Sequence, residues 1–309
     1  MKRLILMLSV LMVDWRVDAA PKNNCDTEET HRCSVGKGIN FYSRAREIEL
    51  GRDLAQDVER EARLIEDPVV SEYVNRIGQN LVKHSGAGYS FVIKVIRSEE
   101  VNALALPGGF LFINSGLVRA VDNEAELAVA IAHEIAHVAA RHYTRQASWS
   151  EMLNYASITL MFIGGWPGMV IQEGLATGTP LALRKLSRGS EAEADKLGIQ
   201  YLYRSGYDPV AFVDFFERIA RTEKSSHGLF ARMLSVHPAL ASRVRAAQRQ
   251  IQRDLSPRPQ YLIQTSEFQL VKARLAAIEN GTRVPWPFAR QSMGADLPPI
   301  LRRRSTAGN

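Results

Sequence analysis

The chain has 309 residues, of which 46% are hydrophobic and 23% are charged, a composition typical of a globular protein. Its formal net charge of +6 would suit an anionic partner such as nucleic acid or an envelope surface. The sequence holds no nucleic-acid recognition motif, so we exclude that class. Much of the excess charge lies in a tail at Arg302, Arg303 and Arg304.

The first residues have the pattern of an export signal. Lys2 and Arg3 precede an apolar run, Leu4 to Val13, and the small residue Ala19 suits a cleavage site. The run is shorter than the roughly 20 residues that span a bilayer. We therefore expect residues 1–19 to be a cleaved signal peptide and the protein to be periplasmic or otherwise exported. An uncleaved anchor is the alternative.

The polar residues 20–43 are expected to form a leader. Cys25 and Cys33 lie within it, and in an exported protein they either pair across a short loop or remain two thiols. Patterned segments follow the leader. We predict helices over Arg44–Ile65 and Pro68–His84, and strands over Tyr89–Arg97, Asn102–Leu106 and Phe110–Asn114.

A central helix is predicted from Asn123 to Tyr143, and it is apolar on nearly all sides. Such a helix is buried. It nevertheless carries His133, Glu134 and His137 in its middle. Burying three ionisable groups is costly unless they are paired or bind a metal.

These three residues form an HExxH pattern, in which the histidines lie one helical turn apart and can bind one zinc ion. Zinc lowers the pKa of a bound water to about 7. Glu134 would act as the general base towards that water during attack on a peptide carbonyl. The alternative is a buried helix whose histidines are satisfied by hydrogen bonds, although the apolar surroundings offer few partners.

The most apolar segment of the chain is Tyr155 to Ile171. A membrane span here would put His133 and His137 on one side of a bilayer and Glu191 on the other. We therefore interpret the segment as core, lid or interfacial flap rather than as a span. Further helices are predicted over Leu183–Arg204, Pro209–Arg221, Pro238–Arg253 and Glu267–Glu279.

A zinc site of this kind needs a third protein ligand. Ala140 and Tyr143 occupy the positions where a metzincin has Gly and His, so that class is excluded. A gluzincin takes a glutamate from a later helix. The segment from Ser187 to Asp195 supplies Glu191 and, as the alternative ligand, Glu193.

The two segments together resemble the HtpX/CAAX-prenyl-protease (Ste-type) family of zinc metallopeptidases, whose third-ligand helix reads S-R-x-x-E-x-x-A-D. The matching positions are Ser187, Arg188, Glu191, Ala194 and Asp195. The resemblance implies that Glu191 completes a site for one Zn²⁺ per chain, with Asp195 steadying a ligand histidine. Among the members, the chain most resembles soluble periplasmic BepA-like ones, and we expect it to lack their C-terminal repeat array.

Two further segments are similar to elements of the family. The strand residues Asn102, Ala103, Leu104 and Ala105 are followed by Pro107-Gly108-Gly109, and the resemblance implies that this strand holds extended substrate by backbone pairing. Ser235-Val236-His237-Pro238 with Arg243 resembles an S-x-H-P…R element. There the resemblance implies that His237 approaches the zinc and restrains activity. The alternatives are a plain hairpin and a histidine that merely begins a helix.

The remaining histidines are predicted not to bind the metal, with His142 rotated off the ligand face. These are His31, His84, His142 and His227.

The expected fold is α+β and mostly helical, a gluzincin-type zincin with a small sheet beside the HExxH helix. Residues 44–257 would form the metallopeptidase domain, and residues 258–309 a C-terminal helix and a disordered basic tail. The expected activity is cleavage of unfolded or misfolded envelope proteins in quality control, with some association with the envelope or membrane surface. The alternative is a zinc-containing chaperone or binding protein with low or latent activity.

Overall fold

The computed structural model describes residues 38–151, 188–225, 240–281 and 300–303. Several features predicted from the sequence lie outside these ranges: the signal peptide, Cys25 and Cys33, the segment Tyr155–Ile171, and His237. None of the helices within the described ranges has the length and apolar character needed to cross a membrane.

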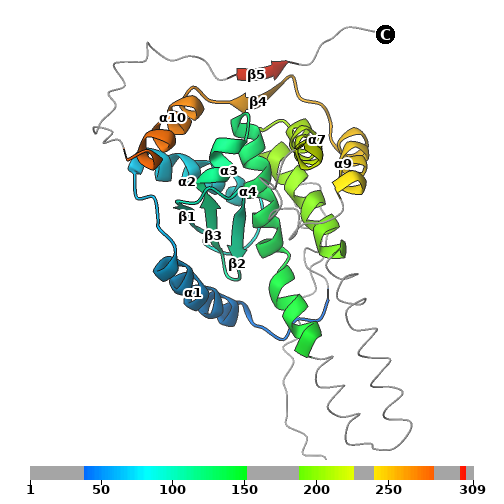
Figure 1. Cartoon of the computed structure of the whole chain (residues 1–309). Helices are drawn as coiled ribbons and strands as arrows, with labels where there is room; N and C mark the ends of the chain where they lie inside the picture. Colours follow the sequence, from blue (N-terminus) through cyan, green and yellow to red (C-terminus); the bar gives the residue numbers. More distant parts are fainter. Residues whose placement is uncertain (1–37, 152–187, 226–239, 282–299, 304–309) are drawn as a thin grey trace, which may run out of the picture. The chain divides into compact units, whose positions relative to one another are not determined.

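Helices dominate the described part of the chain, and a small sheet accompanies them (Figure 1). The N-terminal half contains α1 (Arg44–Glu61), α2 (Pro68–Lys83), β1 (Val92–Ile96), β2 (Ala103–Leu106), β3 (Phe110–Asn114), α3 (Ser115–Ala120) and α4 (Glu124–Ala139). The C-terminal half contains α7 (Val210–Ser225), α9 (Leu240–Asp254), β4 (Gln260–Gln264), α10 (Glu267–Glu279) and β5 (Ile300–Arg303). Residues 142–151 and 188–204 are also helical. The expected α+β, mostly helical fold is confirmed.

The central sheet has the strand order β1-β3-β2, with β1 parallel and β2 antiparallel to β3. Leu111 and Ile113 of β3 are fully buried. Ile93, which pairs with Leu111, faces α2, because a Cβ at Gly78 would lie 2.2 Å from its side chain. The opposite face is the one near α1, where a Cβ at Gly51 would meet Phe110. The sheet is thus a middle layer, and β2 is one of its edges.

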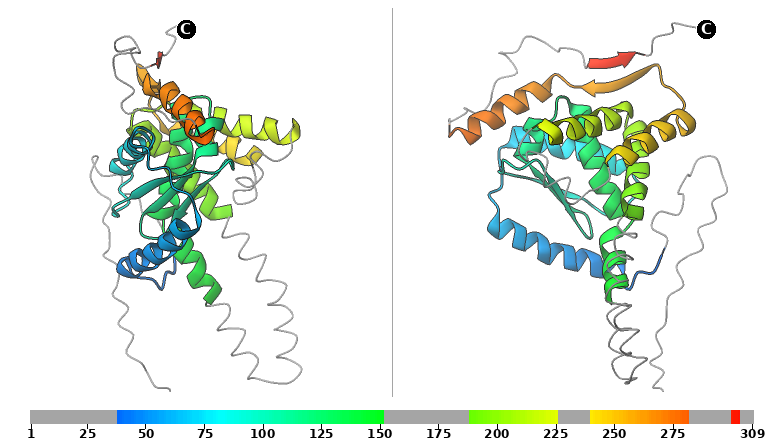
Figure 2. Two further views of the ribbon diagram at one scale, coloured as in Figure 1. Left: turned by 60° about the vertical axis from the view of Figure 1, so that its left-hand side comes forward. Right: turned by 45° about the vertical axis from the view of Figure 1, so that its right-hand side comes forward.

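Helix α4 is the buried centre of the fold, with every residue except Ala139 buried. The Asn123 side chain caps its first turn by accepting from the Glu126 amide at 3.0 Å. Glu126 reaches back to the amide of Asp122 at 2.9 Å, one residue earlier than in a standard capping box. Figures 1 and 2 show α7 beside α4, with α9 packed against α7.

The sequence prediction was wrong about where two helices end. Helix α1 stops at Glu61 instead of Ile65, because residues 63–65 pair with β1; the Ile65 amide donates to Val95 at 2.8 Å. Helix α4 stops at Ala139 instead of continuing to Tyr143. There Arg141 adopts a positive φ of 58°, a conformation that ends a right-handed helix.

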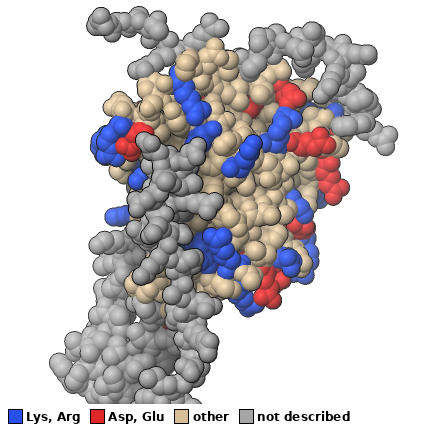
Figure 3. Space-filling view, turned by 180° about the vertical axis from the view of Figure 1, so that it is seen from behind, with Lys and Arg blue, Asp and Glu red and all other residues tan. Residues whose placement is uncertain are grey.

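The C-terminal region also holds a strand pair that the sequence pattern does not indicate. Strands β4 and β5 are antiparallel, with Leu262 opposite Leu301, so part of the expected tail is extended structure. On the face shown in Figure 3, acidic and basic side chains are interspersed over a larger area of uncharged residues.

Candidate metal centre

The centre lies where residues 188–204 cross α4. Gly198 marks the crossing, because a Cβ there would lie 3.4 Å from the backbone nitrogen of His133. The small size of residue 198 allows the two helix backbones to approach closely, because the contact leaves room for little more than a Cβ. This approach brings Glu191, about two turns earlier on its helix, level with His133 and His137.

Ligand atoms of three residues converge at this point. Nε2 of His133 and Nε2 of His137 are 3.0 Å apart. Glu191 places Oε2 at 3.4 Å from the first of these nitrogens and Oε1 at 3.4 Å from the second. In a tetrahedral zinc site with bonds of about 2.1 Å, ligand atoms are about 3.4 Å apart. His133, His137 and Glu191 are buried and form the metal-ligand cluster found among the described residues. The donor set therefore fits a zinc ion with one coordination position left open.

Burial keeps the ligand His137 in the form that binds a metal. It lowers the pKa of His137 from 6.5 to about 4, because a charged imidazolium is poorly solvated in the interior. The ring is consequently neutral at physiological pH, and its nitrogen lone pair is available to a cation.

Asp195 contacts the ring of His133 at the nitrogen that does not face the metal position, as the family resemblance implies. Its Oδ1 is 3.1 Å from Nδ1 of His133. Burial alone would raise the pKa of Asp195, but the contact with His133 and the charge of Arg243 outweigh burial and lower it. The carboxylate therefore stays charged and can fix the orientation of the His133 ring.

Arg243 of α9 has a structural role that sequence reasoning missed. Its guanidinium donates two hydrogen bonds to Asp195, at 2.7 and 2.6 Å, and lies 3.2 Å from Glu191. It also lies over the ring of Phe216, 4.4 Å from the centroid. One buried cation thus balances the two carboxylates around the ligand histidines. The sequence indicated only that Arg243 belongs to a family element.

Glu134 is buried next to the ligands, and the hydroxyl of Tyr143 donates to it at 3.3 Å. Burial and the neighbouring charge of Glu134 raise the pKa of Tyr143, so the phenol stays protonated. A small cavity opens beside Glu134 and His133. Its other lining residues are Asn102, Ala103, Ala130, Phe215, Phe216 and Arg243. The edge strand β2 therefore reaches the same site.

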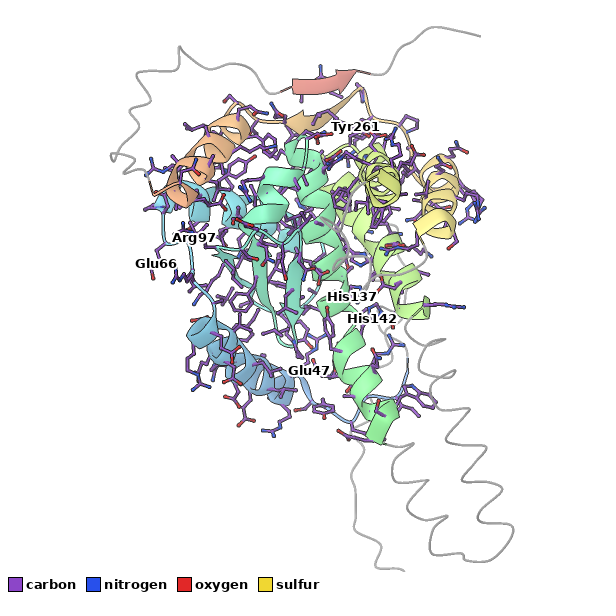
Figure 4. All side chains as sticks on the ribbon, in the orientation of Figure 1. Glu47, Glu66, Arg97, His137, His142 and Tyr261 are labelled. Carbon is purple, nitrogen blue, oxygen red and sulfur yellow. The ribbon has the colours of Figure 1, made fainter. Side chains whose placement is uncertain are left out.

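The structure corrects the interpretation of two polar residues near the ligands. His142 was expected to point away from the site, but its Nδ1 lies 3.0 Å from Nδ1 of His137. Glu193 was considered as an alternative ligand or a solvated acid. It instead contacts Nε2 of His142 at 3.1 Å and Arg145 at 3.3 Å. His142 therefore joins Glu193 to a ligand histidine, and Figure 4 shows His137 and His142 close together.

An HExxH helix whose histidines meet a glutamate from a later helix defines a gluzincin-type metallohydrolase site. Comparison with known families agrees: the profile of Peptidase family M48 matches residues 68–251. The chain belongs to this family.

Similar proteins bear protease names. The "Beta-barrel assembly-enhancing protease" of Escherichia coli (strain K12) is 31% identical over 292 residues, which cover 91% of this chain and 58% of the relative. The "Metalloprotease LoiP" of the same organism is 31% identical over 180 residues, 57% of this chain and 69% of the relative. The "Mitochondrial metalloendopeptidase OMA1" of Schizosaccharomyces pombe is 32% identical over 180 residues, which cover 56% of this chain and 50% of the relative. The chain spans a little over half the length of the first of these relatives.

Proposed function

We propose that the protein is a zinc-dependent endopeptidase that cleaves unfolded or misfolded proteins of the envelope. The observation that supports this most strongly is the geometry of His133, His137 and Glu191, whose closest nitrogen and oxygen atoms approach one another to 3.0–3.4 Å. Two imidazoles and one carboxylate form the ligand set of several catalytic zinc sites. Glu134 beside them supplies a base, which a site that only binds zinc does not need.

When bound, zinc would lower the pKa of a coordinated water to about 7 and polarise the scissile carbonyl. The proton transfers are carried out by residues of the chain itself. Glu134 accepts a proton from the water as its oxygen attacks the carbonyl carbon. As the C–N bond breaks, Glu134 passes that proton to the leaving amide nitrogen. Tyr143, which remains protonated, orients the Glu134 carboxylate through its hydrogen bond.

The edge strand suggests how a substrate is held. Leu104 lies opposite Phe112 in the antiparallel pair, and the Asn114 amide donates to Asn102. In this pattern the backbone groups of Ala103 and Ala105 point away from β3. They can pair with an extended peptide beside Glu134, largely regardless of its side chains. Such recognition favours unfolded chains over folded ones.

The remaining sequence predictions stay part of the proposal. Residues 44–257 would be the peptidase domain, and export would depend on residues 1–19. Location in the envelope is supported by the similarity to a protein named for β-barrel assembly. Restraint by His237 is an additional proposal from the family resemblance.

The test is metal-dependent cleavage of casein by the purified full chain. Removing metal with a chelator should abolish cleavage, and one equivalent of zinc should restore it. Glu191→Gln should bind zinc weakly and remain inactive. Glu217→Gln, which changes an exposed glutamate of α7, is the matched control and should behave as wild type. Cleavage that persists in the chelated protein would overturn the proposal.

A further inference from the structure

The two ligand histidines are supported by different kinds of residue. His133 contacts a carboxylate, with Asp195 Oδ1 at 3.1 Å from its Nδ1. The corresponding nitrogen of His137 contacts another imidazole, with Nδ1 of His142 at 3.0 Å. His142 is itself buried, 3% exposed, and the proximity of the two rings can be followed in Figure 4. Nothing in the HExxH chemistry described above uses His142.

The hydrogen-bonding capacities determine how this pair is protonated. Nε2 of His137 points towards His133 and Glu191. When this nitrogen binds the metal, the proton of the neutral ring lies on Nδ1. That Nδ1–H can donate to Nδ1 of His142. The Nε2–H of His142 then donates to Glu193, 3.1 Å away. Arg145 lies 3.3 Å from the same carboxylate oxygen and donates to it.

The break after α4 makes the contact geometrically possible. On an uninterrupted helix, a residue five positions after His137 would lie about 140° around the axis. Arg141, with its φ of 58°, redirects the chain so that His142 returns to the ligand. The conformation is secured by Glu47 of α1, whose two carboxylate oxygens accept from Arg141 Nε at 2.8 and 3.0 Å. Thr144 also donates to Glu47.

We propose that His142, held by Glu193, is a positioning residue that fixes the tautomer and ring orientation of His137 for metal binding. The inference rests on the proposed metal centre. Partners of this kind typically change metal affinity by about 10–100-fold when they are removed. His142 would therefore act on zinc retention before it acts on catalysis.

The experiment measures the zinc dissociation constant of the full chain by competition with a chromophoric chelator. His142→Leu removes the acceptor and should raise the dissociation constant by about 10–100-fold. His142→Asn can place an amide oxygen near the position of Nδ1 and should restore most of the affinity. His84→Leu is the matched control, because His84 bonds the Asn80 carbonyl and Ser205 instead. Its zinc affinity should equal that of wild type.

A melting curve of each metal-free variant separates local positioning from loss of the fold. If His142→Leu fails to fold, Glu193→Gln provides a second test and should weaken zinc binding several-fold. Wild-type affinity in both His142→Leu and Glu193→Gln would overturn the inference. Failure of the wild-type chain to bind zinc would instead overturn the proposed function, so the two failures are distinguishable.

Discussion

Replacing Arg243 tests whether one buried cation balances the carboxylates of the centre. Arg243→Met keeps most of the side-chain volume and removes the charge. Arg243, Asp195 and Glu191 are 5%, 6% and 6% exposed, so the substitution leaves two buried carboxylates without their guanidinium. Removing one partner of a buried ion pair costs about 3–5 kcal/mol. The structured part of this chain would then melt about 10 °C lower.

The assay is thermal unfolding of the full chain with and without zinc. The decrease should be larger in the metal-free protein, because zinc would offset part of the charge on Glu191. Arg245→Met is the matched control, since Arg245 is exposed two residues further along α9, and its melting temperature should stay within about 2 °C of wild type. If Arg243→Met melts at the same temperature as Arg245→Met, the Arg243 guanidinium does not balance the charges of Asp195 and Glu191.

Three further predictions concern the crossing helices, pH and regulation. At Gly198, alanine should be tolerated in both zinc affinity and stability, because its Cβ makes an ordinary 3.4 Å contact with His133. Valine at this position should push the helices apart and weaken zinc binding at least tenfold. A Gly198→Val variant with the zinc affinity of wild type would refute the close crossing. For His137, the pKa of about 4 in the folded chain lies below the ordinary value of 6.5. Between these two values the unfolded chain therefore binds more protons than the folded chain. Metal-free stability should therefore fall by about 3 kcal/mol as pH drops from 6.5 through 4. Denaturant titrations of wild type and His137→Asn measure this, and equal pH slopes would contradict it. His237→Ala should raise casein cleavage if His237 restrains the site, and an unchanged rate would remove that role.

Sequence reasoning could reach the centre of the site because the relevant signals are local and periodic. The four-residue separation of His133 and His137 places them on one helical face, whatever surrounds the helix. The same four-residue spacing places Glu191 and Asp195 on one face of a later helix, and the structure brings both to the histidines. The placement of three ionisable groups in an otherwise apolar helix indicated that they bind a metal.

The parts that sequence reasoning missed depend on contacts between distant segments. Arg141 bends the chain without a glycine or proline to signal it, and its partner Glu47 lies 94 positions earlier. The contacts of His142 follow from that bend. The pairing of residues 63–65 with β1 likewise depends on an edge that forms only in the folded sheet. Propensity along one segment does not contain such information.

Substituting Glu134 tests the central claim most directly, because it separates metal binding from chemistry. Zinc content per chain and the initial rate of casein cleavage are measured on wild type and Glu134→Gln purified in parallel. We predict that the variant retains one zinc ion per chain while cleavage falls by about 10²–10⁴-fold, the contribution typical of a general base. Wild-type cleavage in a variant that retains its zinc would contradict the assignment of Glu134 as the base.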